Sequence, residues 1–498
     1  MNRQQNETGP AGGAFLRGAN RLGLTAFLLV GLEVLFAVPQ LSWELAVPGR
    51  EGLGTAVSLG AAVLAAFFVW RGREPIRARL GSLAERLARV PRGRWLAGIL
   101  FAGLLLRLVW VLAFPAPQTS DAGTYFALGA KLARGESYVT PLSGTRAEWP
   151  PGLPLLLAAT FRLVGIGRAA VILLNLALFA GLLLATDVLA RRLAGEGPAR
   201  FATLLLAFWP NLITSSGIAN KEAVAALALT LSFVLYLAGQ DARSAGLRWL
   251  SRAGAGSALG LATLAQPAIV LLPAAFVAAD VAGGTPLRRA APSWGLLVAG
   301  MALVIAPWIF RNERVLGRPV LATNGGAVFY RANNPVATGG FGLGERRMDH
   351  MGELEASDTG YRWGLEWIRE NPGDFLALSV RKQILFLGDD AVGVYETLKR
   401  GLGMGGALYA GLKLLACGWW WAVWLLILLG LAGRRTRGTV PAGLLLLLFA
   451  FLYVWAIDSV FESGSRHHVP LAGAIAVLAS LSLSRLPDDP GRRGPEGE

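Results

Sequence analysis

The chain has 498 residues, of which 54% are hydrophobic and 16% are charged, and its formal net charge is +15. Soluble domains carry roughly 25% charged residues, so the composition excludes a soluble multidomain enzyme and a disordered protein. A single cysteine, Cys417, excludes an internal disulfide. The apolar residues come in runs of about 18–25, the length at which a helix crosses ~30 Å of hydrocarbon. The sequence therefore predicts an all-α membrane protein.

The positive charge follows the ends of the apolar runs. Only five of the 47 basic residues are Lys, and the Arg residues cluster next to apolar segments, which fits membrane topology better than a nucleic-acid-binding patch. Residues 71–94 hold eight Arg against two Glu. Because basic residues concentrate in cytoplasmic loops, we expect 71–94 to be a cytoplasmic loop, and we expect no nucleic-acid partner.

The apolar runs predict about twelve transmembrane helices, with both termini in the cytoplasm. The runs lie near 22–39, 52–70, 95–114, 168–190, 200–217, 222–239, 254–281, 293–310, 407–431, 439–456 and 468–484. Pro267 and Pro273 interrupt 254–281, so a hairpin of two short helices is expected there. The apolar pieces 153–164 and 375–387 are short for a span, and each is predicted to be a juxtamembrane helix on the external surface.

These spans divide the chain into four regions. They are residues 1–94, with two N-terminal transmembrane helices and the basic loop; 95–310, a transmembrane core with a first external loop at 115–167; 311–406, a long external loop with a surface helix; and 407–498, the C-terminal transmembrane helices with a cytoplasmic tail.

The first polar candidate is Asp121, just after the third span. Ser120 and Asp121 begin a predicted short helix that Gly135 ends. One interpretation is that Asp121 or Ser120 caps this helix. The other is a carboxylate held at the membrane surface beside Tyr125, which lies one turn further on. An Asp with an ordinary pKa of about 3.9 is ionised near pH 7 and can act as a general base.

Two further candidates lie on the same predicted external side. Lys221 and Glu222 stand at an outer turn between two spans; they form either an interfacial charge pair with Lys221 snorkelling or the mouth of a cavity. Arg466 and His467 begin the last span and either anchor it at the interface or bind phosphate, since Arg grips phosphate oxygens bidentately.

Several stretches match a known family in order. They are SDAGTYFALGAKLARGESYVTP, WPPGLPLLLA, NKEAVAALAL, APWIFRN, TNGGAVFYRANNPVATGG, NPGDFLALSVRK and SRHHVPLAGAIAVLA. Over about 95 to 485 the chain resembles the polyprenyl-phosphate-sugar-dependent glycosyltransferases of the GT-C superfamily. The nearest branch is family 39 with its bacterial relatives, which include protein O-mannosyltransferases and lipid A aminoarabinose transferases. Ala122 stands after Asp121, where many members carry a second acid.

The resemblance implies that 95–310 is a GT-C-like catalytic core. It implies an inverting single displacement in which a sugar passes from an isoprenoid phosphate to a lipid, glycan or protein acceptor at the extracytoplasmic face of the plasma (inner) membrane. The partners are then the lipid-linked donor, the acceptor and the bilayer. The lipid phosphate is already a good leaving group, so no nucleotide and no obligatory metal is expected; a divalent metal is not indicated.

The resemblance also favours Asp121 as the catalytic base. For the donor phosphate, whose developing charge needs cations, we expect Arg466, Lys131, Lys221 and His467. For the sugar or acceptor we expect Tyr125, Glu222, Arg331 and Asn333.

Two other function classes stay open on the residues alone. A transporter or lipid flippase explains the spans equally well, but it predicts polar residues near the bilayer midplane and an internal repeat. A ligase that moves a whole glycan from a lipid diphosphate would share the external site, and donor identity separates it from a transferase. A non-catalytic relative is the third alternative.

Overall fold

The computed structural model describes residues 10–46, 51–432 and 440–484, and within these residues it consists of helices, turns and loops with no strand. In these described ranges, eight helices are long and apolar enough to cross a membrane. They are α1 (Pro10–Ala46), α2 (Glu51–Arg89), α3 (Arg92–Ala113), α6 (Arg168–Ala194), α9 (Lys221–Asp241), α12 (Leu287–Leu316), α17 (Gly406–Ala432) and α18 (Ala442–Val460). The predicted all-α multi-span architecture is confirmed.

Shorter helices account for several of the other predicted spans. The run at 200–217 is divided into α7 (Glu196–Ala207), α8 (Pro210–Thr214) and the 3₁₀ turn η1 (Ser215–Gly217), since Pro210 cannot continue a helix. The broken hairpin expected in 254–281 is present as α10 (Ala245–Ala265), η2 (Pro267–Ile269) and α11 (Pro273–Ala282). The last run forms η4 (Val469–Leu471), α19 (Ala472–Ser480) and η5 (Leu481–Leu483).

Segment α19 lies inside the bundle. It contacts α6, α7, α9 and α17, and all of its residues are buried. A nine-residue helix is only about 14 Å long at 1.5 Å per residue, so α19 itself is too short to cross ~30 Å of hydrocarbon. It fills the core of the bundle, and the residues just before it are held at one end of the molecule.

Helices α10 and α12 approach each other closely because both carry glycine at the contact. A Cβ on Gly256 would lie 2.0 Å from the carbonyl oxygen of Leu297, and one on Gly300 would lie 2.1 Å from that of Ala253. No side chain fits at either glycine, so small residues allow the two backbones to touch, as is typical of membrane helices.

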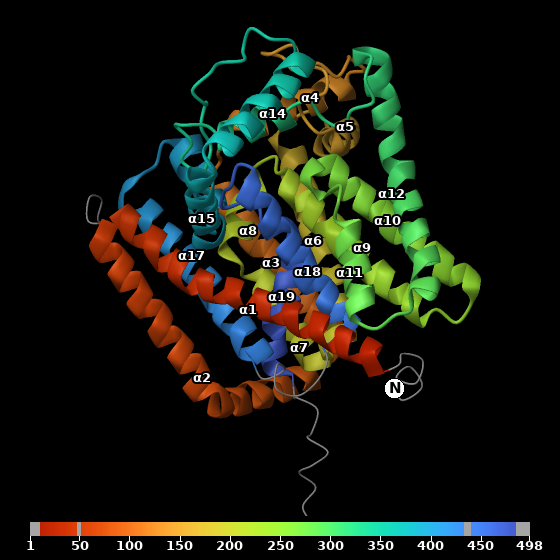
Figure 1. Ribbon diagram of the computed structural model, residues 1–498, viewed down its shortest axis with the longest axis vertical. Helices are drawn as coiled ribbons and strands as arrows, with labels where there is room; N and C mark the ends of the chain where they lie inside the picture. The colour runs from red at the N-terminus through yellow and green to blue at the C-terminus, as the bar shows by residue number, and fades with distance from the viewer. Residues whose placement is uncertain (1–9, 47–50, 433–439, 485–498) are drawn as a thin grey trace, which may run out of the picture.

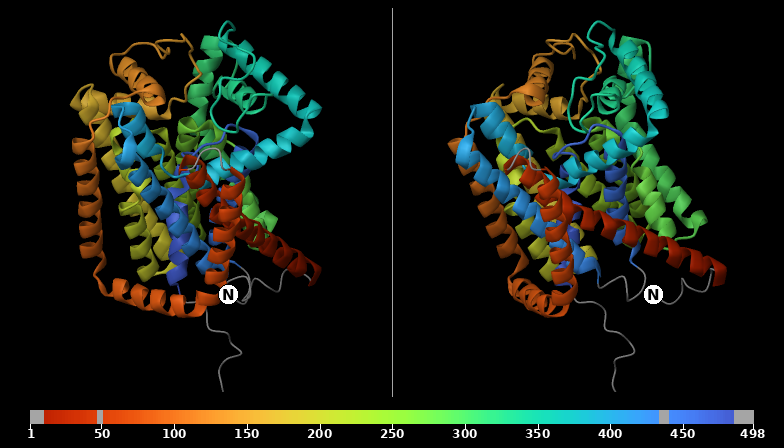
Figure 2. Two further views of the ribbon diagram at one scale, coloured as in Figure 1. Left: turned by 90° about the vertical axis from the view of Figure 1, so that its left-hand side faces the viewer. Right: turned by 60° about the vertical axis from the view of Figure 1, so that its left-hand side comes forward.

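The segment predicted as a basic cytoplasmic loop, 71–94, is largely helical, because α2 continues as a helix to Arg89. Pro75 lies inside α2, and proline removes a backbone hydrogen bond and bends a helix. Figures 1 and 2 show α2 bending, with its second half running along the bottom of the molecule. Apolar residues three or four positions apart, namely Ile76, Leu80, Leu83 and Leu87, favour a helix, and this helix lies across the end of the bundle.

The segment predicted as a long external loop, 311–406, is largely helical. It contains α13 (Gly325–Ala332), α14 (Glu353–Glu370), α15 (Pro372–Gly388), α16 (Val392–Val394) and the π-helical turn η3 (Tyr395–Gly401). Its α15 covers the surface helix expected at 375–387. The surface helix expected at 153–164 is α5 (Gly152–Val164), which packs on α4 (Ser120–Ala133).

The polar segments gather at one end of the molecule. Figure 1 places α4, α5 and α14 together at the top, opposite the lower half of α2. The carboxylate of Glu353 accepts hydrogen bonds from the backbone amides of Arg146 and Ala147, and Thr323 donates to it as well. These bonds join the segment between α3 and α6 to the segment that follows α12, at this end of the bundle.

Candidate active site

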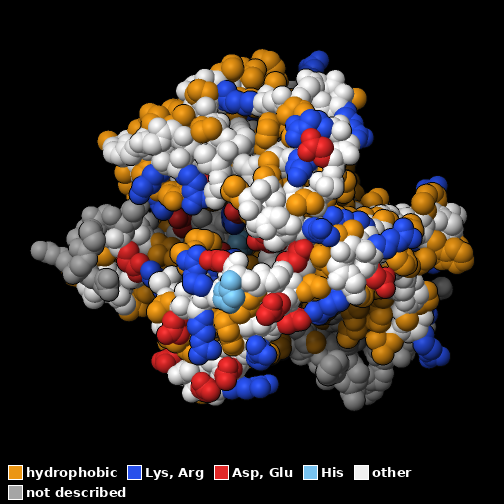
Figure 3. All heavy atoms as spheres, turned by 90° about the horizontal axis from the view of Figure 1, so that it is seen from above, with side chains coloured by type: hydrophobic (Ala, Val, Ile, Leu, Met, Phe, Trp, Pro, Cys, Tyr) orange, Lys and Arg blue, Asp and Glu red, His pale blue; other side chains and the backbone are white. Residues whose placement is uncertain are grey.

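A small cavity lies where the starts of α4 and α9 meet the residues that precede α19. Its lining includes Asp121, Tyr125, Lys221, Glu222 and Arg466. The space open to water-sized groups is 40 Å³, about the room needed by one water molecule. Figure 3 looks down on this end of the molecule and shows charged side chains of both signs around a recess near its middle.

An ion pair closes the cavity. Arg466 Nη1 lies 2.7 Å from Asp121 Oδ2, and Arg466 Nε lies 3.7 Å from Glu222 Oε1. Burial favours the neutral carboxyl, but the charge and hydrogen bond of Arg466, with the charges of Lys221 and Arg400, outweigh it and lower the pKa of Asp121 below its ordinary value. Asp121 is therefore ionised at neutral pH, and a guanidinium holds it in this state.

The backbone directs Asp121 into the cavity. Thr119 is the N-cap residue of α4 and its side chain makes no capping bond, so Asp121 stands inside the first turn. The interpretation of Ser120 or Asp121 as the cap is wrong for this reason. Ser120 has φ +52° and is the one non-glycine residue with positive φ in the described ranges. Such a conformation is sparsely populated and is concentrated at functional sites.

Glu222 supplies a second carboxylate. Asn220 caps α9 by accepting a hydrogen bond from the backbone amide of Glu222 at 2.8 Å, which fixes Glu222 in the first turn. The residue is 5% exposed, and its Oε1 has no hydrogen-bond partner. A buried carboxylate oxygen without a donor is costly, so Glu222 presents an unused acceptor to the cavity.

Tyr125 lies one turn after Asp121 and is buried, with its ring edge-to-face against Trp149 at 5.2 Å between centroids. Burial, together with the charges of Glu222 and Asp121, raises the pKa of Tyr125 well above its ordinary value. The phenol is therefore protonated at neutral pH.

Sequence reasoning missed two charged residues at this cavity. Glu396 lines it, and Arg400 Nη1 donates to Glu396 Oε1 at 3.0 Å. Burial raises the pKa of Glu396 against the opposing charges of Arg400 and Arg466. Both residues lie on the π-helical turn η3, a conformation frequent at functional sites. No feature of the YETLKR stretch distinguishes it from an ordinary surface turn.

A buried network supports the cavity from behind. His468 Nε2 lies 2.9 Å from Asp390 Oδ1, and both side chains are fully buried. Asp390 also accepts hydrogen bonds from Trp209 and Asn211, and His468 stacks on Trp420 with centroids 4.3 Å apart. These contacts fix the backbone two residues after Arg466, so they orient the segment that carries its guanidinium.

The other predicted site residues are held elsewhere. Lys131 Nζ donates to the carbonyl of Val139 at 3.0 Å, and the ring of His467 pairs with Asp458. Neither side chain lines the cavity. A role for Lys131 and His467 in binding the donor phosphate stays a prediction.

Arg331 and Asn333 also lie outside the cavity lining. Arg331 Nε is 3.8 Å from Glu462 Oε2. The amide of Asn333 donates to the carbonyl of Val460 at 2.8 Å and accepts from Lys382 Nζ at 2.9 Å. Their contacts join α13 to the chain between α18 and α19, which is a structural role.

A second small cavity adjoins the charged one. The two share Ser215, Asn220 and Val469. Its lining is mixed, because Leu178 and Phe179 of α6 lie beside the buried Arg107. Over residues 10–46, 51–432 and 440–484, no three His, Cys, Asp or Glu side chains form a group that could hold a metal ion.

No protein-family model and no curated protein matches the sequence. Among solved structures, ArnT from Cupriavidus metallidurans bound to undecaprenyl phosphate is similar, with 14% identity, a TM-score of 0.42, and 79% of this chain and 78% of that chain covered. The Archaeoglobus fulgidus oligosaccharyltransferase in the apo form is similar with 12% identity and a TM-score of 0.48. The match covers 78% of this chain and 50% of that chain.

A second structure of the archaeal enzyme, AglB in complex with an inhibitory peptide and a dolichol-phosphate, has 13% identity, a TM-score of 0.47, and the same coverage of 78% and 50%. This chain thus spans half the length of the oligosaccharyltransferase. Similarity at this level assigns no activity to the chain.

Proposed function

We propose that the chain is a membrane glycosyltransferase that moves a sugar from an isoprenoid phosphate to an acceptor hydroxyl at the cavity of Asp121 and Arg466. The observation that carries the proposal is the 2.7 Å contact between these two side chains. It unites an ionised carboxylate, which can take a proton, with a guanidinium, which can hold a phosphate.

In the proposed reaction the acceptor oxygen bonds to the anomeric carbon with its lone pair while the bond from that carbon to the phosphate oxygen breaks. The electron pair leaves with the lipid phosphate, and the acceptor proton passes to Asp121. Arg466, with Lys221 beside it, stabilises the negative charge that develops on the leaving phosphate. Attack opposite the leaving group inverts the anomeric centre.

The ion pair gives the proposed reaction an order. Arg466 pairs with Asp121 in the structure, and the open space of the cavity is 40 Å³. A donor phosphate competes for the guanidinium and draws it away, which frees Asp121 and opens room for the acceptor. Asp121 then becomes a base only when a donor is present, and this protects the donor from premature attack by water.

The proposed location is the plasma (inner) membrane, with the cavity extracytoplasmic and both termini cytoplasmic. The support is that the Arg-rich half of α2 and the polar end with α4 and α14 lie at opposite ends of the molecule (Figure 1). Basic segments remain on the cytoplasmic side.

The test is Asp121→Asn in native membranes, compared with Asp349→Asn, an exposed residue of the same type away from the cavity. We expect the first variant to express normally and to lose transfer, so that mass analysis of membrane lipids shows unconsumed isoprenoid-phosphate sugar. The control should match the native chain. Retained transfer with Asp121→Asn would rule out Asp121 as the catalytic base.

A further inference from the structure

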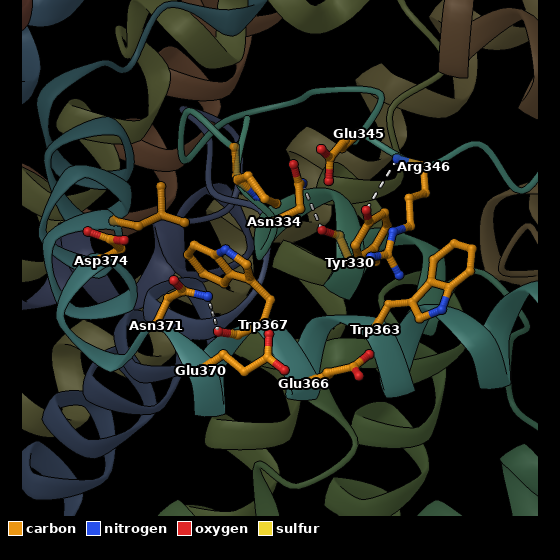
Figure 4. A pocket seen from close by; sticks show the side chains of 13 residues that line it. Tyr330, Asn334, Glu345, Arg346, Trp363, Glu366, Trp367, Glu370, Asn371 and Asp374 are labelled. Carbon is orange, nitrogen blue, oxygen red and sulfur yellow. Dashed lines mark hydrogen bonds between the residues drawn. The ribbon is translucent and has the colours of Figure 1, made fainter.

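A second, larger cavity lies at the same end of the molecule, between α13, α14 and α15. Its volume is 530 Å³, within the range of cavities that bind small molecules. Figure 4 shows Trp367 near its middle, with Glu366 and Glu370 on one side of the indole and Glu345 on the other. The residues that line this cavity are not those that line the cavity of Asp121.

The two tryptophans of this cavity differ in how far other side chains cover their rings. Trp363 is covered by the ring of Tyr330 at 5.3 Å and by the Arg346 guanidinium at 5.2 Å. Trp367, one turn later on α14, is half-buried. Within the part of the chain that the structure describes, its ring has no aromatic or cationic partner and its Nε1–H makes no hydrogen bond. Trp367 therefore presents a free face and a free donor to the cavity.

The charge of the cavity is opposite to that of the chain. Glu345, Glu366, Glu370 and Asp374 line it against one cation, Arg346, which leaves a net charge of −3 in a protein of net charge +15. None of these four carboxylates forms an ion pair with a Lys or Arg among residues 10–46, 51–432 and 440–484. With 47 basic residues in the chain, an unpaired acidic ring around a tryptophan is available for an external cation.

We propose that this cavity binds a small polar ligand through a protonated amine, with the amine over the face of Trp367 and within the ring of carboxylates. A cation above an indole is attracted by the ring quadrupole, and a concave wall of one sign concentrates ions of the other. The free Nε1–H supplies a donor for a hydroxyl of the same ligand. Phosphates are repelled, so this cavity is not a second donor site.

The cavity is linked to the candidate active site through α13. Tyr330 faces the larger cavity, while the next residue, Arg331, approaches Glu462, four residues before Arg466. The proposal does not depend on transfer by Asp121, because it concerns binding alone.

The test is calorimetric titration of the purified full chain in detergent with a matched pair of probes. One is an oligosaccharide of glucosamine, and the other is the same oligosaccharide with every amine acetylated, which removes the charge. We expect the aminated probe to bind and the acetylated one to bind at least about tenfold more weakly, equivalent to 1.4 kcal/mol. Equal binding of the two probes, or no binding of the aminated one, would overturn the proposal.

A third probe, spermidine, separates two sources of the amine. If spermidine binds as tightly as the aminated oligosaccharide, the cavity takes free polyamines. If it binds more weakly, the sugar hydroxyls contribute and the ligand is an aminated saccharide. Either result retains the protonated amine as the recognised group.

Substitutions inside and outside the cavity test whether the aminated probe binds there. Replacing both Glu366 and Glu370 by Gln should weaken the aminated probe roughly fivefold to tenfold, since each exposed ion pair contributes up to about 1 kcal/mol, and Trp367→Ala should weaken it about fivefold. Glu355→Gln, on the same helix and outside the cavity, is the matched control and should change nothing. Asp121→Asn should leave binding unchanged, so a failure here is separable from a failure of the proposed transferase.

Discussion

Replacing Arg466 tests two parts of the proposed mechanism separately: the grip on the donor phosphate and the ionisation of Asp121. Its contact with Asp121, 2.7 Å from nitrogen to oxygen, has the length of a charge-assisted hydrogen bond. Arg466→Lys keeps the charge but loses the planar fork that can grip a phosphate with two parallel bonds. One lost charge-assisted bond costs about 1.5–3 kcal/mol, so we expect kcat to fall roughly tenfold to a hundredfold.

Arg466→Gln removes the charge as well, and its effect on pH dependence has a definite sign. Arg466 lowers the pKa of Asp121, so without it that pKa rises. A general base must be deprotonated, and activity is lost as the pH falls through its pKa. The acidic limb of the pH–rate profile should therefore move to higher pH in Arg466→Gln.

The assay is transfer from membrane-extracted lipid-linked donor at a series of pH values, with Arg347→Lys as the control. Arg347 is exposed and pairs with Asp349 away from the cavity. A general folding defect would lower the rate at every pH without moving the limb. Native kcat in Arg466→Lys, or an unmoved acidic limb in Arg466→Gln, would refute the proposed link between this guanidinium and Asp121.

Four further outcomes are expected. Glu222→Gln should raise the KM for the acceptor about tenfold (1.4 kcal/mol) with kcat less affected, because Oε1, which accepts no hydrogen bond and lies 3.7 Å from Arg466 Nε, is placed to accept one from an acceptor hydroxyl; an unchanged KM would contradict this. Asp390→Asn should lower the Tm of the purified chain, since it replaces an acceptor that the buried Trp209, Asn211 and His468 share and an unsatisfied buried polar group costs about 1–3 kcal/mol; an unchanged Tm would contradict the role of the network. Gly300→Val should also lower the Tm, because a Cβ there meets the carbonyl of Ala253 at 2.1 Å. Cysteine at Ser143 should react with an impermeant thiol reagent in intact cells and cysteine at Ser82 only after permeabilisation; the reverse would invert the proposed topology.

The composition and the apolar runs predicted the all-α architecture because a helix that crosses a bilayer needs about 20 consecutive apolar residues. The predicted number of spans was less accurate. The stretch 200–217 is apolar enough for a span, yet Pro210 divides it, and 468–484 is apolar because it is buried among other helices rather than in lipid. Apolar composition alone does not distinguish a lipid-facing helix from a buried one.

The candidate site shows the same limit for charged residues. Asp121, Lys221, Glu222 and Arg466 could be nominated from their places at the ends of spans, and the structure brings them to one cavity. Lys131 has an equivalent place in the sequence and points to a backbone carbonyl instead. Which way a side chain at an interface points depends on packing between distant segments, and a single sequence does not encode that in any local pattern.

The buried position of α19 has a consequence for how the protein is made. Its neighbours α6, α7, α9 and α17 all precede it in the chain, so they leave the ribosome first and must leave a slot that α19 fills later. Arg466 reaches Asp121 only when that slot is filled. The proposed base therefore stays without its guanidinium throughout most of synthesis, and a chain that stops before α19 would insert many helices without assembling the cavity.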